Sequence, residues 1–137
     1  MTTDVVVLDT HVLVWLLEGD LRLSISARET IGAASRVCIS AITPWEIGML
    51  VAKGRLGFGQ DVQQWIDEVL ALPAVHLVPL LPSIAIASTR LPGELHGDPA
   101  DRLIAATARH LDATLVTADG KLLAYAAAGH LRVLAAT

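Results

Sequence analysis

The sequence predicts an α/β fold in three layers, with a mostly parallel central sheet flanked by helices. Short β-branched apolar runs alternate along the chain with stretches whose apolar residues recur at helical spacing, which is the order typical of βα units. The apolar runs are continuous, as expected for strands that are covered on both faces. The 137 residues contain no repeat, linker or low-complexity tract, so we expect a single domain over residues 1–137.

The expected strands are short runs of apolar residues that stop where a polar residue or a turn begins. In order, they cover residues 4–8, 36–40, 76–80, 113–117 and 131–134. The first stops at Asp9, the second contains the single cysteine, Cys38, and the fourth ends just before Asp119. One cysteine cannot form an internal disulfide, which fits a reducing compartment.

The expected helices lie between these strands and are marked by capping residues or by apolar stripes. In order, they cover residues 10–18, a segment from 26, 43–53, 61–72, 82–91, 98–111 and a short segment from 121. Ser26 with Glu29 is typical of a capping box. Thr43 and Asp98 each precede a proline and stand three residues before an acid, so each is expected to cap the helix that follows it.

Charge and hydropathy exclude two broad classes of function. The 14 acidic residues exceed the 10 basic ones, and the net charge of -4 argues against a nucleic-acid binder that relies on an overall basic surface. No apolar run approaches the roughly 20 residues of a membrane-spanning helix. The start of the chain, at residues 1–4, lacks the basic region of a secretory signal. We therefore expect a cytoplasmic protein.

Four acids, Asp9, Glu46, Asp101 and Asp119, fall at expected strand ends or in the first turns of helices. In open α/β sheets, ligands bind beyond the carboxyl ends of the strands, where helix N-termini also point. If the strand order brings these points together, the carboxylates repel one another unless protons or cations compensate. Oxygen ligands favour Mg²⁺ or Mn²⁺, and acidic metal sites with open positions typically carry out phosphoryl chemistry.

Each of these acids also has a purely structural explanation. At the third position of a capped helix, Glu46 and Asp101 would be favoured by about 0.3–1 kcal/mol through the capping box and the helix dipole. Asp9 can cap a helix, and Asp119 with Gly120 can form an ordinary turn. The structural explanation needs four separate coincidences, whereas one shared site explains all four positions.

Four segments that contain these acids occur in an informative order. They are Val7-Leu8-Asp9-Thr10-His11, residues 40–47 with Trp45-Glu46, Asp98-Pro99-Ala100-Asp101-Arg102-Leu103-Ile104-Ala105-Ala106, and Leu115-Val116-Thr117-Ala118-Asp119. Their order and spacing resemble those of PIN-domain ribonucleases, and most of all the VapC toxins of toxin–antitoxin pairs. The resemblance implies a PIN-like fold, a Mg²⁺ or Mn²⁺ cofactor, hydrolysis of RNA phosphodiester bonds, a homodimer, and a cognate antitoxin that binds it in a dimeric or larger toxin–antitoxin complex.

Carried over position by position, the resemblance assigns the family's catalytic and metal-binding acids to Asp9, Glu46, Asp101 and Asp119. Asp98 is ambiguous, because it precedes Pro99 as a helix cap but lies on the same helical face as Asp101; the capping role is favoured.

The hydroxyls of Thr10 and Thr117 flank the acids and are candidates to orient a carboxylate or a metal-bound water.

Basic side chains beside the acidic motifs are candidate contacts to RNA. Arg102, His11 and His96 lie next to these motifs, although histidines in exposed loops usually have no specific role. Lys53 and Arg55 close the glutamate helix, where compensation of the helix dipole explains them equally well. Packing in the core or a dimer is favoured over base stacking for the three tryptophans, Trp15, Trp45 and Trp65.

Two other classes of function stay open on the sequence. One is a receiver-like signalling domain with a phosphoacceptor Asp at a strand end, although such domains carry an adjacent pair of acids and a separate phosphoacceptor strand. The other is a catalytically inactive PIN-fold binding module, which the intact acids at all four matching positions make less attractive. Cleavage of RNA in Mg²⁺ distinguishes the nuclease from both.

Overall fold

The computed structural model describes residues 4–95 and 97–137. Its central sheet has five strands in the order β3-β2-β1-β4-β5, and every neighbouring pair is parallel. The strands are β1 (Val5–Leu8), β2 (Arg36–Ser40), β3 (Val75–Val78), β4 (Thr114–Thr117) and β5 (Val133–Ala135). The predicted α/β fold is confirmed, and the sheet is parallel throughout.

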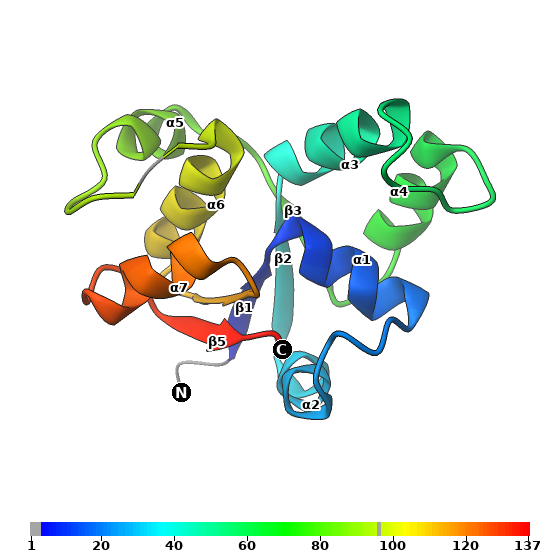
Figure 1. Ribbon diagram of the computed structural model, residues 1–137, viewed down its shortest axis with the longest axis horizontal. Coiled ribbons are helices and arrows are strands. Elements are labelled where there is room, and N and C mark those ends of the chain that lie inside the picture. The colour runs from blue at the N-terminus through cyan, green and yellow to red at the C-terminus, as the bar shows by residue number, and fades with distance from the viewer. Residues whose placement is uncertain (1–3, 96) are drawn as a thin grey trace.

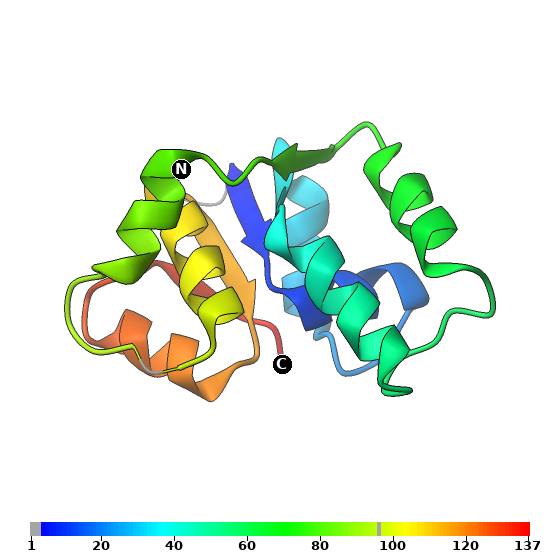
Figure 2. The ribbon, with the colours of Figure 1, turned by 90° about the horizontal axis from the view of Figure 1, so that it is seen from above.

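Helices cover both faces of this sheet. They are α1 (Thr10–Glu18), α2 (Ile25–Ala33), α3 (Ile42–Ala52), α4 (Val62–Leu70), α5 (Pro82–Thr89), α6 (Pro99–His110) and α7 (Gly120–Ala127). Figure 1 shows α5, α6 and α7 on one side of the strands and α1, α3 and α4 on the other, and the view from above in Figure 2 shows the same separation. Among the described residues, no helix is long and apolar enough to cross a membrane.

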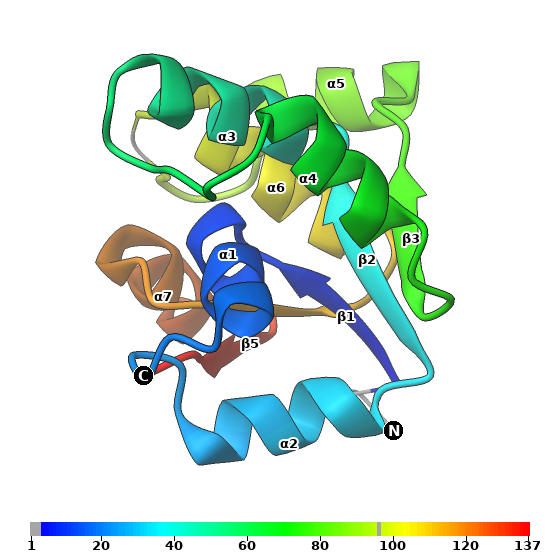
Figure 3. The ribbon, with the colours of Figure 1, turned by 90° about the vertical axis from the view of Figure 1, so that its right-hand side faces the viewer.

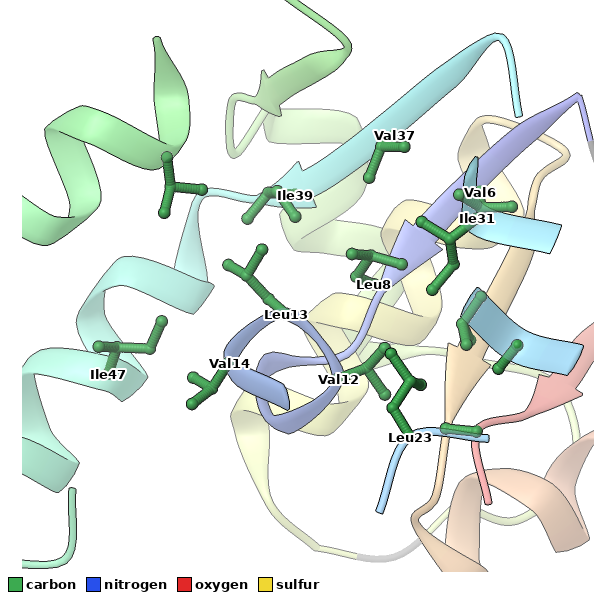
Figure 4. Packing of buried hydrophobic residues seen from close by; sticks show 14 of the residues in the cluster. Val6, Leu8, Val12, Leu13, Val14, Leu23, Ile31, Val37, Ile39 and Ile47 are labelled. Carbon is green, nitrogen blue, oxygen red and sulfur yellow. The ribbon is translucent and has the colours of Figure 1, made fainter. Parts of the chain in front are cut away.

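Side chains of the central strands alternate between two hydrophobic clusters. Val6 and Leu8 of β1 pack with residues of α1, α2 and α4, whereas Val7 between them packs with residues of α6 and α7. Figure 4 shows the first cluster, in which Leu13 of α1 lies close to the strands. Burial on both faces explains why the strands are continuous apolar runs, and each fully buried Val or Leu contributes about 1.5–3 kcal/mol.

The order of the strands creates a crevice beside β1. From β1 the chain builds the sheet in one direction through β2 and β3, and then returns to add β4 and β5 on the other side of β1. The carboxyl ends of β1 and β4 are joined by a hydrogen bond from the Asp9 amide to the Val116 carbonyl (3.0 Å). Such a reversal of strand order is where open α/β sheets bind their ligands.

Helix α2 begins earlier than the capping box predicted. Its N-cap is Ser24, whose hydroxyl accepts from the Ala27 amide (3.0 Å), so the expected cap at Ser26 is wrong. The Ser24 amide donates to the Ala136 carbonyl, which holds Ser24 in an extended conformation and lets the helix begin at the next residue. Glu29 therefore lies beyond the first turn. Figure 3 shows α2 at the amino ends of β1 and β2, and α3 at the opposite ends.

Helix α3 also begins ahead of its expected cap. It begins at Ile42, whose amide donates to the Ser40 hydroxyl (3.2 Å), and the predicted cap, Thr43, lies inside the helix and is fully buried. Pro44 still falls within the first turn, where a missing N–H costs little. Glu46 is the fifth helical residue, beyond the reach of a capping box, so the structural explanation for this acid is wrong.

Candidate functional site

A cavity of about 280 Å³ lies at the carboxyl end of the sheet and contains all four predicted acids. Its lining consists of Asp9, Glu46, Asp98, Asp101 and Asp119 together with His11, Trp15 and Ala118. No Lys or Arg from the described part of the chain lines it. The structure therefore brings together acids that follow β1 and β4 with acids at the start of α6 and in α3, and His11 is the one basic side chain from the described residues beside them.

Asp9 is placed by the two strands that border the crevice. It follows β1 directly and is only 7% exposed. One carboxylate oxygen, Oδ1, accepts from the Thr10 amide (2.8 Å), and Oδ2 accepts from the Thr117 hydroxyl (2.6 Å) at the end of β4. Burial raises the pKa of Asp9, and these two hydrogen bonds oppose that increase because they stabilise the ionised form. One oxygen of Asp9 is thus bonded to the start of α1 and the other to the end of β4.

Glu46 is held by a chain of hydroxyls. The Thr10 hydroxyl donates to Oε1 of Glu46 (2.5 Å), and the Thr43 hydroxyl lies 3.2 Å from the Thr10 hydroxyl. Because Thr10 has one proton and gives it to the carboxylate, Thr43 must donate to Thr10. Burial raises the pKa of Glu46, and the Thr10 hydroxyl opposes that increase. The sequence predicted Thr43 only as a helix cap. Its position one helical turn before Glu46 was the signal that could have indicated a role in supporting this acid.

Asp101 carries the least compensated charge in the cavity. It lies in the first turn of α6, and its carboxylate has no hydrogen-bond partner among the described residues. Burial, followed by repulsion from Asp119, Asp9, Asp98 and Glu46, raises its pKa from 3.8 to about 7. A carboxylate in this condition gains more than the others when a cation or a proton arrives.

The remaining two acids cap helices while they line the cavity. Asp98 caps α6 by accepting from the Ala100 amide (2.9 Å). Asp119 caps α7 by accepting from the amides of Lys121 (2.8 Å) and Leu122 (3.2 Å), both through Oδ1. Capping and membership of the cavity are compatible for both residues, because helix N-termini point into the crevice.

The donor set fits a hard divalent cation. Every oxygen ligand in the cavity is a carboxylate, and their mutual repulsion is the condition that such a cation relieves. In the described part of the chain, no three Asp, Glu, His or Cys side chains already converge closely enough to enclose a metal ion. Mg²⁺ does not require this, because it typically takes one or two carboxylates and keeps water in its other positions.

The basic residues predicted beside the site differ in whether their side chains are available to contact RNA. The Arg102 guanidinium donates through Nε to the Ser88 carbonyl (2.8 Å) and through Nη1 to the Leu95 carbonyl, so it ties α6 to neighbouring backbone. His11 is exposed and lines the cavity. His96 lies outside the described residues. Thr10 and Thr117 each bond a predicted catalytic acid, as expected for residues that orient carboxylates.

Comparison with known proteins assigns the family. The model of the PIN domain matches residues 6–128. This chain belongs to the PIN-domain family. It is 37% identical over 122 residues to Ribonuclease VapC22 of Mycobacterium tuberculosis, in an alignment that covers 89% of this chain and 91% of that protein. The predicted relationship of this PIN-domain protein to VapC ribonucleases is therefore confirmed.

Solved structures support the same PIN-domain fold. A toxin–antitoxin complex from Klebsiella pneumoniae is similar at a TM-score of 0.66 and 26% identity, over 96% of this chain and 98% of that one. VapBC2 from Rickettsia felis, bound to a DNA fragment from its promoter, is similar at a TM-score of 0.69 and 20% identity, over 95% and 97% of the two chains. At that identity, the second likeness supports the fold alone.

Proposed function

We propose that this PIN-domain protein is a Mg²⁺- or Mn²⁺-dependent endoribonuclease and the toxin of a toxin–antitoxin pair. The observation that carries the proposal is the cavity at the reversal of strand order, which gathers Asp9, Glu46, Asp101 and Asp119. No Lys or Arg among the described residues lines it. The similarity to Ribonuclease VapC22 supports RNA as the substrate. A toxin that cleaves RNA acts in the cytoplasm.

Asp9 and Asp101 are the principal ligands in this proposal, directly or through water, and Asp119 completes the cluster or holds a second ion. A divalent cation held by these acids would supply the activation of water and the stabilisation of charge on the phosphate oxygens. Repulsion from the other acids favours the protonated form of Asp101 near neutral pH, and Asp101 would release this proton when it binds the cation. Asp9 keeps its orientation because its two oxygens are bonded to Thr10 and Thr117.

Glu46 is placed to accept a proton from the attacking water. Thr10 donates to Oε1, so Oε2 is the oxygen that accepts the water's proton, and burial raises the pKa of this carboxylate toward the value that a general base needs. The water oxygen bonds to phosphorus while the bond to the 3′ oxygen breaks and that oxygen takes a proton. The products carry a 5′-phosphate and a 3′-hydroxyl, and the 2′-hydroxyl takes no part.

Control by an antitoxin fits the same charge imbalance. The solved neighbour from Klebsiella pneumoniae is a toxin–antitoxin complex. An antitoxin segment with an Arg or Lys against the carboxylates would offset the repulsion that a cation offsets. A homodimer, alone or within a larger toxin–antitoxin complex, belongs to the same proposal.

Cleavage of RNA with defined controls tests the proposed activity. Wild-type protein should cleave structured RNA in Mg²⁺ and lose that activity in EDTA. Asp9→Asn should lose it too. The matched control Asp67→Asn changes an exposed carboxylate on α4 whose one side-chain partner among the described residues is Gln63, and it should keep the activity.

Cleavage that persists in EDTA or in Asp9→Asn contradicts the proposal, and products that end only in 2′,3′-cyclic phosphate contradict attack by water. No cleavage of any RNA by wild-type protein favours the inactive binding module. The match to the PIN-domain model removes the receiver-like alternative.

A further inference from the structure

A second cavity, of about 500 Å³, adjoins the acidic one. His11 and Trp15 line both cavities. It lies between α1 and the end of α3, and its volume is within the roughly 300–1,000 Å³ of pockets that hold small ligands. Resting on the proposed RNA hydrolysis, we propose that this cavity receives an unpaired nucleotide next to the scissile phosphate, with its base against Trp15 and Arg22 and a phosphate on Arg55.

The end of helix α1 builds one wall of this cavity. Gly19 adopts a φ of +68°, a left-handed conformation that side chains rarely adopt, and it ends the helix. The chain reverses there, and the Asp20 amide donates to the Trp15 carbonyl (2.9 Å). This reversal brings the Arg22 guanidinium over the indole of Trp15, with its Cζ 5.0 Å from the ring centroid.

Arg22 is fixed above the indole by Asp20. The guanidinium donates through Nε to both carboxylate oxygens of Asp20 (3.1 and 3.2 Å) and through Nη2 to Oδ2 (2.7 Å). The Arg22 guanidinium holds the pKa of Asp20 at about 2, so the two charges offset each other. Arg22 covers one face of the Trp15 indole and its charge is offset by Asp20, so the outer face of the guanidinium and the other indole face are the surfaces open to a base. Unpaired bases in RNA stack on aromatic rings and on guanidinium planes.

The end of helix α3 builds the opposite wall. Gly54, with a φ of +71°, ends α3, and the Arg55 amide then donates to the Leu50 carbonyl (2.9 Å). Arg55 is exposed, and its guanidinium has no ion pair or hydrogen bond with any described residue. It is a cation that lines the cavity without an offsetting partner.

Charge and continuity favour RNA over a peptide as the occupant. Of the two acids in the cavity, Asp20 pairs with Arg22, whereas Glu18 accepts from the neutral indole N–H of Trp65 (3.4 Å) and keeps its charge. Arg55 is the cation that remains to meet a phosphate, and the two cavities share His11 and Trp15 in their linings. A strand with one phosphate at the carboxylates places its neighbouring nucleotide here. A base-paired nucleotide cannot enter, so the cavity selects unpaired RNA.

Paired changes in protein and RNA test the base platform. The substrate is a short single-stranded oligoribonucleotide that contains a site cut by the wild type, with each nucleotide beside the cut replaced in turn by an abasic one. Trp15→Leu should lower kcat/KM by about 5- to 150-fold, which corresponds to the loss of one stacked base, and Trp15→Phe should restore most of it. At one abasic position the loss should equal that of Trp15→Leu, and combining the two should add nothing.

Salt dependence tests the phosphate contact. In the Asp101→Asn background, which removes cleavage, Arg55→Gln should weaken binding of the same oligoribonucleotide and reduce the slope of log K against log salt by about 0.7, the contribution of one phosphate on a single strand. Arg36→Gln changes an exposed arginine at the amino end of β2, opposite the end that carries the site; it is the matched control and should leave the slope unchanged.

The failure of the subsite is distinguishable from the failure of the nuclease proposal. If wild-type protein cleaves no RNA in Mg²⁺, the proposed function is wrong. If it cleaves RNA but Trp15→Leu and the abasic substitutions multiply their losses at every position, or Arg55→Gln keeps the wild-type salt slope, the subsite is wrong. Variants that cleave RNA normally but bind an antitoxin peptide more weakly would assign the cavity to a protein partner and overturn the subsite as well. Thermal melting of each variant excludes loss of folding as the cause.

Discussion

The two ends of helix α6 carry charged clusters that differ in how their charges are balanced. At the N-terminal end, Asp98 and Asp101 line a cavity without any Lys or Arg from the described residues. At the C-terminal end, a cavity of about 320 Å³ has two arginines in its lining. There Arg109 donates to the His130 carbonyl, and Arg132 pairs with Asp112 (2.9 Å) and bonds its carbonyl.

The difference in charge balance distinguishes residues that stabilise the fold from residues that are available to bind a ligand. The arginines at the C-terminal end donate to backbone carbonyls. Positive charge at this end of a helix also interacts favourably with the helix dipole. At the N-terminal end, burial and the neighbouring acids raise the pKa of Asp101, and such like-charge clusters oppose folding unless protons or cations compensate. Both ends of α6 carry charged residues, so the residue type alone does not indicate function. A charge that has no partner in the folded protein is the better indicator.

The largest expected effect comes from removing the least compensated acid. Asp101→Asn should lower Mg²⁺-dependent RNA cleavage by about 100-fold or more, because a principal cation ligand is lost. Asp112→Asn, at the other end of the same helix, is the control and should keep the activity within about twofold. Rates of cleavage at saturating RNA measure both. Equal rates for Asp101→Asn and wild type would show that the acidic cavity is not the catalytic one.

Addition of a divalent cation should stabilise the protein through the same acids. At a concentration of Mg²⁺ or Mn²⁺ about 100 times its Kd, the stabilisation is about 2.7 kcal/mol, a shift in Tm of roughly 10 °C for a chain of this size. Asp101→Asn should respond less. Thermal melting with added cation and with EDTA measures the shift. A shift of the same size in both proteins would place cation binding elsewhere.

Metal-free protein should lose stability as pH rises from about 4 to 7. The pKa of Asp101 is about 7 in the folded state and 3.8 as the ordinary value, so the folded state binds the proton more tightly. Its stabilising effect is complete below pH 4 and is lost as pH rises through 7. Allowing for solvent screening of this half-buried group, the loss is about 2 kcal/mol. Urea unfolding in EDTA measures it, and Asp101→Asn should flatten the curve; a wild-type stability that rises over this range would contradict it.

The smallest expected effect lies at the balanced end of α6. Arg109→Gln removes the hydrogen bond to the His130 carbonyl and should lower the free energy of unfolding by about 1 kcal/mol, because an exposed charged bond contributes little. RNA cleavage should stay at the wild-type rate. Urea unfolding and the cleavage assay together test this. A large loss of cleavage without a loss of stability would mean that this end of the helix also serves the reaction.

Much of the local structure could be predicted because its causes lie within a few residues. The change from strand to helix at Asp9 follows from a β-branched run and helical spacing, and the start of α6 follows from Asp98 and Pro99. The two helix starts that were wrong have distant causes. Ser24 is held by a bond to Ala136, and Thr43 is drawn inward to Thr10, and neither contact can be read from the neighbouring sequence.

The sequence by itself determined the α/β alternation, the family and the four acids, because these depend on periodicity, caps and residue identity. Only the tertiary structure decided that β1 and β4 are neighbours, which joins Asp9 to Thr117 across 108 positions of the chain. It also decided which charges have partners: the Arg102 guanidinium donates to two backbone carbonyls, whereas the Asp101 carboxylate and the Arg55 guanidinium have no partner among the described residues. Charge balance depends on distance and burial, and folding sets both between residues that the sequence keeps far apart.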